Sequence, residues 1–307
     1  MNISIIGGDL RIVRLAEMYS LEEDKNINVF IYGLEKYFKE NAKKSTNNNE
    51  SEKIKICSTL NEAAAISEII ISGMPFSKDN IFVNTPFSDE KIEIKELAKL
   101  LEGKTFIAGG ISEILRENDK IKIIDLLENE ALTILNAIPT VEGAIKIAIE
   151  EREETIHEST VLVCGYGRIG KILCDRFRDL GANVYCAARK DTDLAWIREK
   201  RCIPLRYDEL YKYAKEFDIV INTVPTKILN KEELDSFRKD ITIIDLASKP
   251  GGVDEEYAKE IGVKVIIALG IPGKEQPKTA ARYMKDAISK CIWLWLYDYN
   301  LFLNSSI

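Results

Sequence analysis

The sequence predicts an α/β protein in which parallel strands and helices alternate to form two doubly wound domains. Short apolar runs rich in β-branched residues recur along the chain, and segments with helical periodicity separate them. A length of 307 residues is sufficient for two domains that each bury a core. One stretch, Thr160 to Gly170, joins an apolar strand to a glycine-rich turn and a helix, the order found in a βαβ nucleotide-binding unit.

The first half of the chain contains six predicted strands and an amphipathic helix. The first strand runs into Gly7-Gly8, but this turn lacks the full Gly-x-Gly-x-x-Gly pattern, so we assign it no dinucleotide. The helix is expected at 90–101, and the polar, asparagine-rich stretch 43–53 is expected to be a mobile loop. The predicted strands cover residues 2–6, 27–32, 55–57, 68–72, 104–108 and 121–125.

The middle of the chain predicts the junction between the domains. Residues 128–138 have a helical pattern that Pro139 is expected to end, and Thr140 is a suitable N-cap for a long helix over 140–156. The start of that helix would face a cleft between the domains. The predicted parts are a substrate or partner domain at 1–139, a nucleotide-binding domain at 140–288, and a C-terminal helix and tail at 289–307.

The second half has the complete pattern of a dinucleotide fold. Its last helix should run from Pro277 to about Tyr297 and return to the first domain. The predicted strands are 161–164, 183–188, 203–206, 219–224, 241–247 and 263–268. Helices are expected between them, near 171–180, 193–200, 208–216, 230–238 and 254–261.

The glycine-rich turn has the residues that a pyrophosphate site requires. Gly165 permits a tight turn, Gly167 lets the backbone approach the phosphates, and Gly170 lets the helix pack closely on the strand. The helix N-terminus adds free N–H groups and a partial positive charge. We therefore expect a Rossmann-like dinucleotide site at Gly165, Gly167, Arg168, Ile169 and Gly170; the alternative is a turn that binds no ligand, with Arg168 on the surface.

The residues after the second strand of this unit favour NADP over NAD. An NAD site usually has Asp or Glu there, whereas this chain has Arg189 and Lys190, and no carboxylate occurs before Asp191. An arginine can bind a 2′-phosphate through two hydrogen bonds, and the lysine adds a charge. Two solvated cations at a strand end are the alternative. The loop Asn222, Thr223 and Pro225 should border the nicotinamide ribose.

Composition limits the other classes of function. A net charge of −7 argues against general nucleic-acid binding. Six cysteines without a C-x-x-C pair indicate buried thiols in a reducing cytoplasm, with no metal site, and the single histidine, His157, is expected on the surface. We expect no signal peptide and no membrane span, since the apolar run 292–303 is too short. Its aromatic residues, Trp293, Trp295, Tyr297 and Tyr299, would cover a domain or a partner subunit.

Several motifs together resemble the family of dipicolinate synthase A subunits from spore-forming bacteria. The resemblance covers residues 1 to about 290, and the runs at 248–252 and 272–280 are its most specific parts. The matching stretches are Gly7-Gly8-Asp9-x-Arg11, Asn136-x-Ile138-Pro139-Thr140-x-Glu142-Gly143-Ala144, the Gly165–Gly170 turn, Ala188-Arg189, Asp218–Pro225, Asp245–Gly252 and Gly270-x-Pro272-Gly273-Lys274-x-x-Pro277-Lys278-Thr279-Ala280.

The resemblance implies an NADP-linked oxidation of a dihydrodipicolinate to dipicolinate during sporulation, in the cytoplasm of the mother cell. It also implies that the partner is the flavoprotein-like B subunit of dipicolinate synthase, and therefore an oligomer. A dicarboxylate substrate requires cations and helix N-termini. The candidates are Arg11, Thr140, Ser248 and Thr279 for binding the substrate, and Lys278, Glu142 and Lys249 for catalysis, with Asp9 as a further acid or base.

Each of these roles has an alternative. Lys278 could be a solvated lysine, and Glu142 could simply stabilise the first turn of its helix. The chain could be another two-domain NADP-dependent dehydrogenase of a hydroxy or amino acid, although a hydroxy-acid enzyme normally uses a His–carboxylate pair and only one His is present. It could also be a non-catalytic NADP-binding scaffold that regulates its partner.

Overall fold

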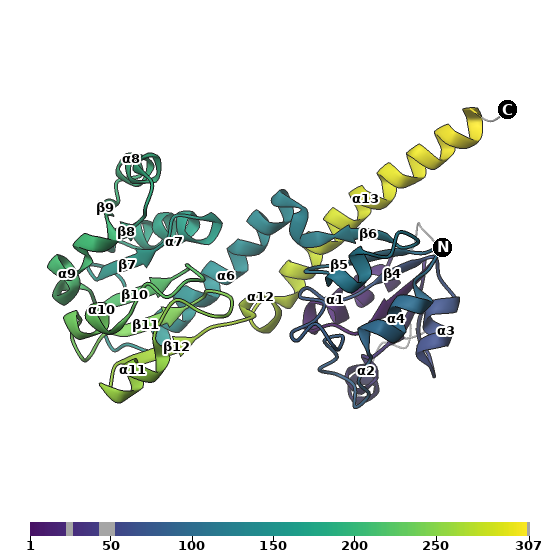
Figure 1. Cartoon of the computed structure of the whole chain (residues 1–307), viewed down its shortest axis with the longest axis horizontal. Helices are drawn as coiled ribbons and strands as arrows, with labels where there is room; N and C mark the ends of the chain where they lie inside the picture. The colour runs from purple at the N-terminus through teal and green to yellow at the C-terminus, as the bar shows by residue number, and fades with distance from the viewer. Residues whose placement is uncertain (23–26, 43–52, 306–307) are drawn as a thin grey trace. The chain divides into compact units, whose positions relative to one another are not determined.

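The computed structural model describes residues 1–22, 27–42 and 53–305, with side-chain environments as far as Ile292. Nearly all of the predicted loop at 43–53, and the aromatic side chains from Trp293 onward, lie outside this description. The chain divides into two compact units, and in Figure 1 unit 1 carries both the purple to blue N-terminal part and the yellow C-terminal helix. Unit 1 comprises Met1–Thr133 and Gln276–Ile307, and unit 2 comprises Ile134–Glu275.

Unit 1 contains a parallel sheet that has six strands in the described residues, as predicted. Its order is β3-β2-β1-β4-β5-β6, so the chain moves outward from β1 to β3 and then returns to the other side of β1. This reversal places a switch point between β1 and β4. The strands are β1 (Asn2–Ile6), β2 (Asn28–Tyr32), β3 (Ile54–Ile56), β4 (Ile69–Ile71), β5 (Thr105–Ala108) and β6 (Lys122–Asp125).

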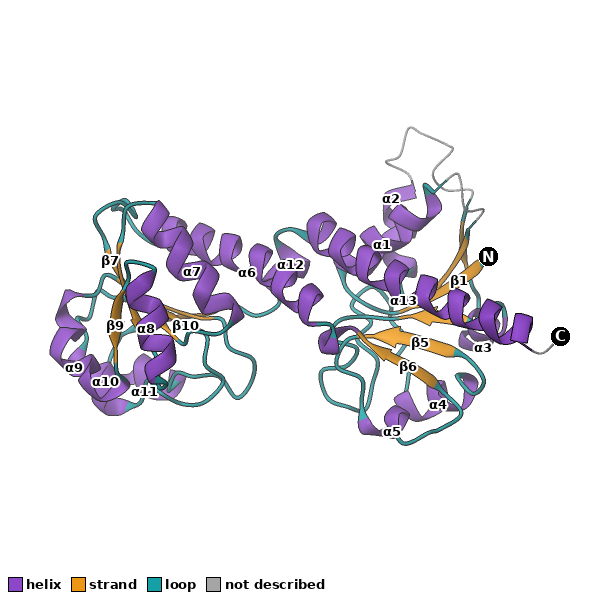
Figure 2. Ribbon diagram, turned by 90° about the horizontal axis from the view of Figure 1, so that it is seen from above, coloured by secondary structure: helices purple, strands orange, loops and turns teal. Residues whose placement is uncertain are grey.

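Helices cover both faces of this sheet because its strands alternate side chains between two apolar cores. Ile3 and Ile5 of β1 point into one core and Ile6 into the other. Figure 2 shows α1 and α13 on one side of β5 and β6, with α4 and α5 on the other. The helices are α1 (Leu10–Ser20), α2 (Glu35–Ala42), α3 (Leu60–Ala65), α4 (Ile94–Leu100), α5 (Glu113–Arg116), the 3₁₀ turn η1 (Leu126–Glu128) and α13 (Pro277–Ser305).

Unit 2 repeats this topology, and its strands agree with the predicted ones within two residues at each end. The order in the described residues is β12-β11-β10-β7-β8-β9, all parallel, with the switch point between β7 and β10. The strands are β7 (Thr160–Cys164), β8 (Asn183–Ala187), β9 (Ile203–Leu205), β10 (Ile219–Asn222), β11 (Thr242–Asp245) and β12 (Lys264–Ile267).

The helices of unit 2 also lie in two layers. Side chains from α6, α7, α8 and α12 fill one core, and those from α9, α10 and α11 fill the other. Gly270 is the N-cap of the short helix α12. The bounds are α6 (Glu130–Glu150), α7 (Arg168–Asp179), α8 (Asp191–Glu199), η2 (Tyr207–Glu209), α9 (Leu210–Tyr213), η3 (Ala214–Glu216), α10 (Lys231–Ser236), α11 (Glu255–Glu260) and α12 (Ile271–Lys274).

Helix α6 corrects the prediction that Pro139 ends one helix and Thr140 caps the next. Pro139 lies inside a continuous helix, and Thr140 Oγ1 donates to the Asn136 carbonyl oxygen at 3.2 Å. Proline in a helix interior removes one backbone hydrogen bond and normally kinks or breaks the helix. Packing compensates here, since Leu132 lies in a core of unit 1 and Val141 in a core of unit 2.

Helix α6 is also long and apolar enough to span a membrane by length and composition alone. Length and apolar composition are weak evidence for a membrane span, because the core helix of a globular protein has both. Of its most apolar window, 44 % is buried inside the protein. Val141, Ala144 and Ala148 belong to a core of unit 2, which accounts for this composition without a membrane.

The last helix belongs to unit 1, so the prediction that it returns to the first domain is confirmed. Ala281, Met284 and Ile288 of α13 lie in the core that α1 helps to form, and Lys285 Nζ lies 2.6 Å from a Glu22 carboxylate oxygen. The two compact units divide after Thr133 and after Glu275, whereas the sequence-based boundaries lie at residues 139 and 288.

Candidate functional site

The switch point of unit 2 is where a dinucleotide should bind. Ligands of doubly wound sheets lie beyond the carboxyl ends of the strands, where the strand order reverses. Cys164 at the end of β7 is in register with Ala187 of β8 and with Asn222 of β10. The loops that follow these strands therefore leave the same edge of the sheet at the same level.

The glycine-rich turn between β7 and α7 has the geometry that the sequence predicts. Gly165 has φ +98°, which favours glycine, and Gly167 is the N-cap of α7. A Cβ on Gly170 would lie 2.0 Å from the Gly165 carbonyl oxygen, so the helix packs too closely on the turn for any larger residue. A Cβ on Gly167 would meet no protein atom within 4 Å. The turn is therefore tight on its inner side and open where a pyrophosphate would approach.

The two cations predicted to hold a 2′-phosphate follow β8 after one intervening residue, Ala188. Arg189 and Lys190 are both exposed, and neither forms an ion pair with any residue that the structure describes. Lys190 is also the N-cap residue of α8, and its side chain makes no capping hydrogen bond. Both cations are thus free to meet an anion at this edge of the sheet.

A small, mainly apolar pocket adjoins Arg189. Its volume is about 240 Å³, and Arg189, Tyr207, Val224, Thr226 and Ile228 line it. The last four residues follow β9 and β10, so the pocket opens at the same edge as the glycine-rich turn. Burial raises the pKa of the Tyr207 phenol well above its usual range. Sequence reasoning missed Tyr207, Thr226 and Ile228; the available signal was their position shortly after predicted strands.

The end of β10 and the loop after it hold the three residues that are predicted to border the nicotinamide ribose. The Asn222 side chain is fully buried: Nδ2 donates to Asp245 Oδ1 at 2.8 Å and to the Val224 carbonyl oxygen, and Oδ1 accepts from Val224 N–H. These hydrogen bonds engage the Asn222 side chain inside the protein, where it holds the loop. Thr223 Oγ1 donates to the Cys164 carbonyl oxygen at 2.8 Å, whereas Pro225 is exposed.

The loop after β11 presents Ser248 and Lys249 to solvent. Asp245 supports this loop, because Oδ1 accepts from Ala247 N–H and Oδ2 accepts from Gly252 N–H at 3.0 Å. The buried pair Asn222–Asp245 therefore fixes two neighbouring loops at the carboxyl edge of unit 2. This places the exposed Ser248 and Lys249 on a rigid support.

The other predicted residues are distributed over both units. In unit 2, Glu142 is exposed on α6, while Thr140 is buried in the same helix. In unit 1, Lys278 and Thr279 follow Pro277 in the first turn of α13, as predicted. Lys278 is exposed and Thr279 is half-buried.

Arg11 of unit 1 has a structural role that the sequence did not predict. Its side chain is buried, its guanidinium pairs with Asp9 at 2.6 Å, and Nη2 also donates to the Met74 carbonyl oxygen. Asp9 in turn caps α1 by accepting from Arg11 N–H. These bonds tie the turn after β1 to the loop after β4, so Arg11 and Asp9 both serve the fold.

The turn after β1 differs from its counterpart in unit 2. A Cβ on Gly7 would lie 2.9 Å from both Thr85 Cγ2 and Val83 Cγ1, and Gly8 N–H donates to the Asn84 carbonyl oxygen at 2.7 Å. The segment around Asn84 therefore covers the glycines, whereas Gly167 faces open space. This packing explains why a similar strand–turn–helix unit offers less room for phosphates.

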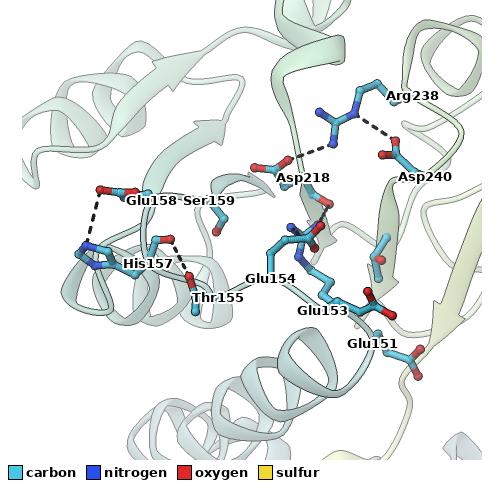
Figure 3. Close-up of a pocket in the computed structure, with 12 residues that line it drawn as sticks. Glu151, Glu153, Glu154, Thr155, His157, Glu158, Ser159, Asp218, Arg238 and Asp240 are labelled. Carbon is cyan, nitrogen blue, oxygen red and sulfur yellow. Dashed lines mark hydrogen bonds and ion pairs between the residues drawn. The ribbon is translucent and has the colours of Figure 1, made fainter.

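A second pocket of unit 2, of about 550 Å³, lies at the opposite, amino edge of the sheet (Figure 3). Half of its lining residues are acidic, and Arg238 pairs with Asp218 at 3.0 Å and with Asp240 at 3.1 Å. His157 lines it with a side chain that is 70 % exposed, which confirms its predicted surface position. The histidine is thus at the wrong end of the strands to act at the dinucleotide edge.

The cysteines lie mostly inside the protein. Cys57, Cys164, Cys174, Cys186 and Cys202 are buried free thiols, as the sequence predicted. Burial raises the pKa of the Cys57 thiol to about 11. Among the described residues, no group of three or more His, Cys, Asp or Glu side chains could hold a metal ion.

Fold and site together define a two-domain, dehydrogenase-like protein with a nicotinamide-dinucleotide-binding unit. Residues 141–260 match the family model of the NAD binding domain of D-isomer specific 2-hydroxyacid dehydrogenases, and residues 2–128 match that of the N-terminal domain of the dipicolinate synthase A subunit. The chain belongs to the family of dipicolinate synthase A subunits. It is 41 % identical to the A subunit of dipicolinate synthase from Bacillus subtilis over 215 residues, which cover 68 % of this chain and 72 % of that protein.

Two crystal structures extend this likeness to the whole fold. The A chain of dipicolinate synthase from Bacillus subtilis superposes with a TM-score of 0.80 at 32 % identity, covering 97 % of both chains. The corresponding dipicolinate synthase A subunit from Bacillus halodurans gives 0.78 at 28 % identity, covering 94 % of this chain and 97 % of that one. The resemblance inferred from the motifs is therefore confirmed.

Proposed function

We propose that this chain is an NADP-linked oxidoreductase that oxidises a dihydrodipicolinate to dipicolinate. The proposal rests on the features that lie together at the carboxyl edge of the sheet in unit 2, in a chain that belongs to this family. An open glycine-rich turn and two cations without ion pairs in the described structure lie there beside an apolar pocket. These features suit a pyrophosphate, a 2′-phosphate and an adenine ring respectively.

The residues of unit 2 divide the work of holding the dinucleotide. Backbone N–H groups at the start of α7 face the pyrophosphate, and Arg168 adds a charge beside them. Arg189 and Lys190 neutralise the 2′-phosphate, and Tyr207 and Ile228 enclose the adenine. Thr223 and Pro225 border the ribose of the nicotinamide, on a loop that the buried Asn222 keeps in place.

The reaction sets the demands on the substrate site. Conversion of the dihydro-acid to dipicolinate removes a hydride and a proton, and a bound nicotinamide would accept the hydride. The chain has to bind two carboxylates, orient the ring and accept the proton. Ser248 and Thr279 are the exposed or half-exposed hydroxyls for binding, Lys249 and Lys278 are the cations, and Glu142 is the carboxylate that could accept the proton. Arg11 and Thr140 are less suited, because the protein itself engages both.

The family also suggests a partner protein and a place of action in the cell. The relatives are A subunits of a synthase, so we expect this chain to act with the flavoprotein-like B subunit in a hetero-oligomer. By the same resemblance, it would work in the cytoplasm of the mother cell during sporulation. A scaffold role without chemistry would leave NADP binding intact but make activity depend wholly on the partner.

Titration calorimetry of the isolated chain with NADP⁺, NAD⁺ and dipicolinate tests the proposal. Tight binding of NADP⁺, weaker binding of NAD⁺ and binding of dipicolinate are expected. Binding of NADP⁺ without dipicolinate would assign substrate binding to the partner and favour the scaffold role. If neither dinucleotide binds, the proposal is wrong.

A second candidate is oxidation of a 2-hydroxy acid, which the match of residues 141–260 to that dehydrogenase family favours. Such enzymes normally use a His–carboxylate pair to move the proton. The single histidine lies at the amino edge of the sheet, away from the dinucleotide edge. Assays with 2-hydroxy acids and NADP⁺ or NAD⁺ should therefore give no turnover.

A further inference from the structure

Arg206 lies beside the cations that we assign to the 2′-phosphate, although it is 16 residues from Lys190 and 17 from Arg189 in the sequence. Strand β9, at the edge of the sheet, ends at Leu205, which is in register with Ala187. Ala188 N–H donates to the Leu205 carbonyl oxygen at 3.1 Å. The residue after β9 therefore leaves the sheet next to the residues after β8.

Arg206 forms an ion pair with Asp191 in this structure. Its Nη2 donates to Oδ1 of Asp191, the first residue of α8. The Arg206 side chain is 47 % exposed and that of Asp191 is 84 % exposed. An ion pair this exposed is weak, and the carboxylate can move into solvent without disturbing the core.

We propose that Arg206 is a third residue that binds the 2′-phosphate and that Asp191 is its internal competitor. The inference rests on the proposed NADP site. The Asp191 carboxylate carries one negative charge, whereas a phosphate monoester carries between one and a half and two at neutral pH and offers three acceptor oxygens. A guanidinium binds such an anion through two parallel hydrogen bonds. The phosphate therefore displaces Asp191 from Arg206.

This exchange makes Arg206 and Asp191 determinants of specificity. NAD⁺ has a ribose hydroxyl in place of the phosphate, so it leaves the ion pair closed. NADP⁺ opens the pair and gains Arg206 in addition to Arg189 and Lys190. Asp191 also lowers NADP⁺ affinity by like-charge repulsion, which sets how strongly the site prefers NADP⁺.

Two variants with matched controls test the inference, with calorimetric affinities for NADP⁺ and NAD⁺ as the readout. Arg206→Met should weaken NADP⁺ binding about tenfold, as expected for one charge-assisted contact, and leave NAD⁺ binding unchanged. Asp191→Asn should strengthen NADP⁺ binding. The control variants, Arg198→Met and Glu199→Gln, remove one positive and one negative charge at the other end of α8 and should alter neither affinity. Thermal melting checks that all four variants fold like the wild type.

The possible failures are distinguishable. If the wild type binds NADP⁺ and Arg206→Met leaves that affinity unchanged, the inference is wrong while the proposed function stands. If Asp191→Asn weakens NAD⁺ binding and does not strengthen NADP⁺ binding, Asp191 is a ribose ligand and the inference is likewise overturned. A wild type that binds neither dinucleotide overturns both the inference and the proposed function.

Discussion

Replacing Gly170 by alanine tests how the glycine-rich turn is built. The new Cβ would lie 2.0 Å from the Gly165 carbonyl oxygen, well inside the closest contact that real Cβ atoms show. The obstacle is backbone, so α7 or the turn has to shift. Overpacking of this kind costs about 1–3 kcal/mol, and the better helix propensity of alanine returns at most about 1 kcal/mol. We expect a net loss of about 1–2 kcal/mol, which lowers the Tm of unit 2 by about 3–6 °C.

Gly167→Ser is the matched control for this substitution. The Cβ of a serine at the N-cap of α7 would have open space around it, and serine is a preferred capping residue, so stability should be unchanged or slightly higher. Its side chain would occupy the space that a pyrophosphate requires, so NADP⁺ binding should weaken strongly. Calorimetric melting and NADP⁺ titration separate the two effects. The reasoning fails if Gly170→Ala melts like the wild type, or if Gly167→Ser binds NADP⁺ normally.

Three further substitutions test other parts of the structure. Asn222→Leu removes a buried donor to Asp245 and should lower the free energy of unfolding in urea by about 2–4 kcal/mol, whereas the exposed Asn183→Leu should have little effect. Because folding raises the pKa of Cys57 to about 11 from about 8.5 in the unfolded chain, its contribution to stability is complete below about pH 8.5 and is lost as the pH rises through 11. Cys57→Ala should reduce the slope of the unfolding free energy against pH between about pH 8.5 and 11. If a slope of the same size persists in the variant, other groups cause the pH dependence. Arg189→Asp should shift binding from NADP⁺ toward NAD⁺; unchanged NADP⁺ affinity would contradict the 2′-phosphate assignment.

Strands were easier to predict than helices, for a physical reason. Each buried parallel strand is a run such as Val161 to Cys164, apolar on both faces, and this composition is visible locally. Helices α3 and α5 have six and four residues, too few for a periodic pattern, and packing against the sheet stabilises them. Pro139 misled the prediction because burial of α6 in the cores outweighs its lost hydrogen bond.

The sequence by itself determined the parts of the site that depend on neighbours in the chain. The spacing of Gly165, Gly167 and Gly170 after an apolar strand, and the cations directly after the next strand, are local features that keep their meaning in any doubly wound fold. Their positions at the carboxyl edge of unit 2 follow from the alternation of strands and helices.

Only the tertiary structure decided which polar side chains are engaged inside the protein and which face outward. Asn222 turns inward because Asp245, at the end of the neighbouring strand, accepts its hydrogen bond. Arg11 is held by Asp9 and by the loop after β4. Arg206 stands beside Ala188 because β8 and β9 are paired in register. All of these outcomes depend on contacts between residues distant in the chain, and such contacts exist only once the sheets have formed.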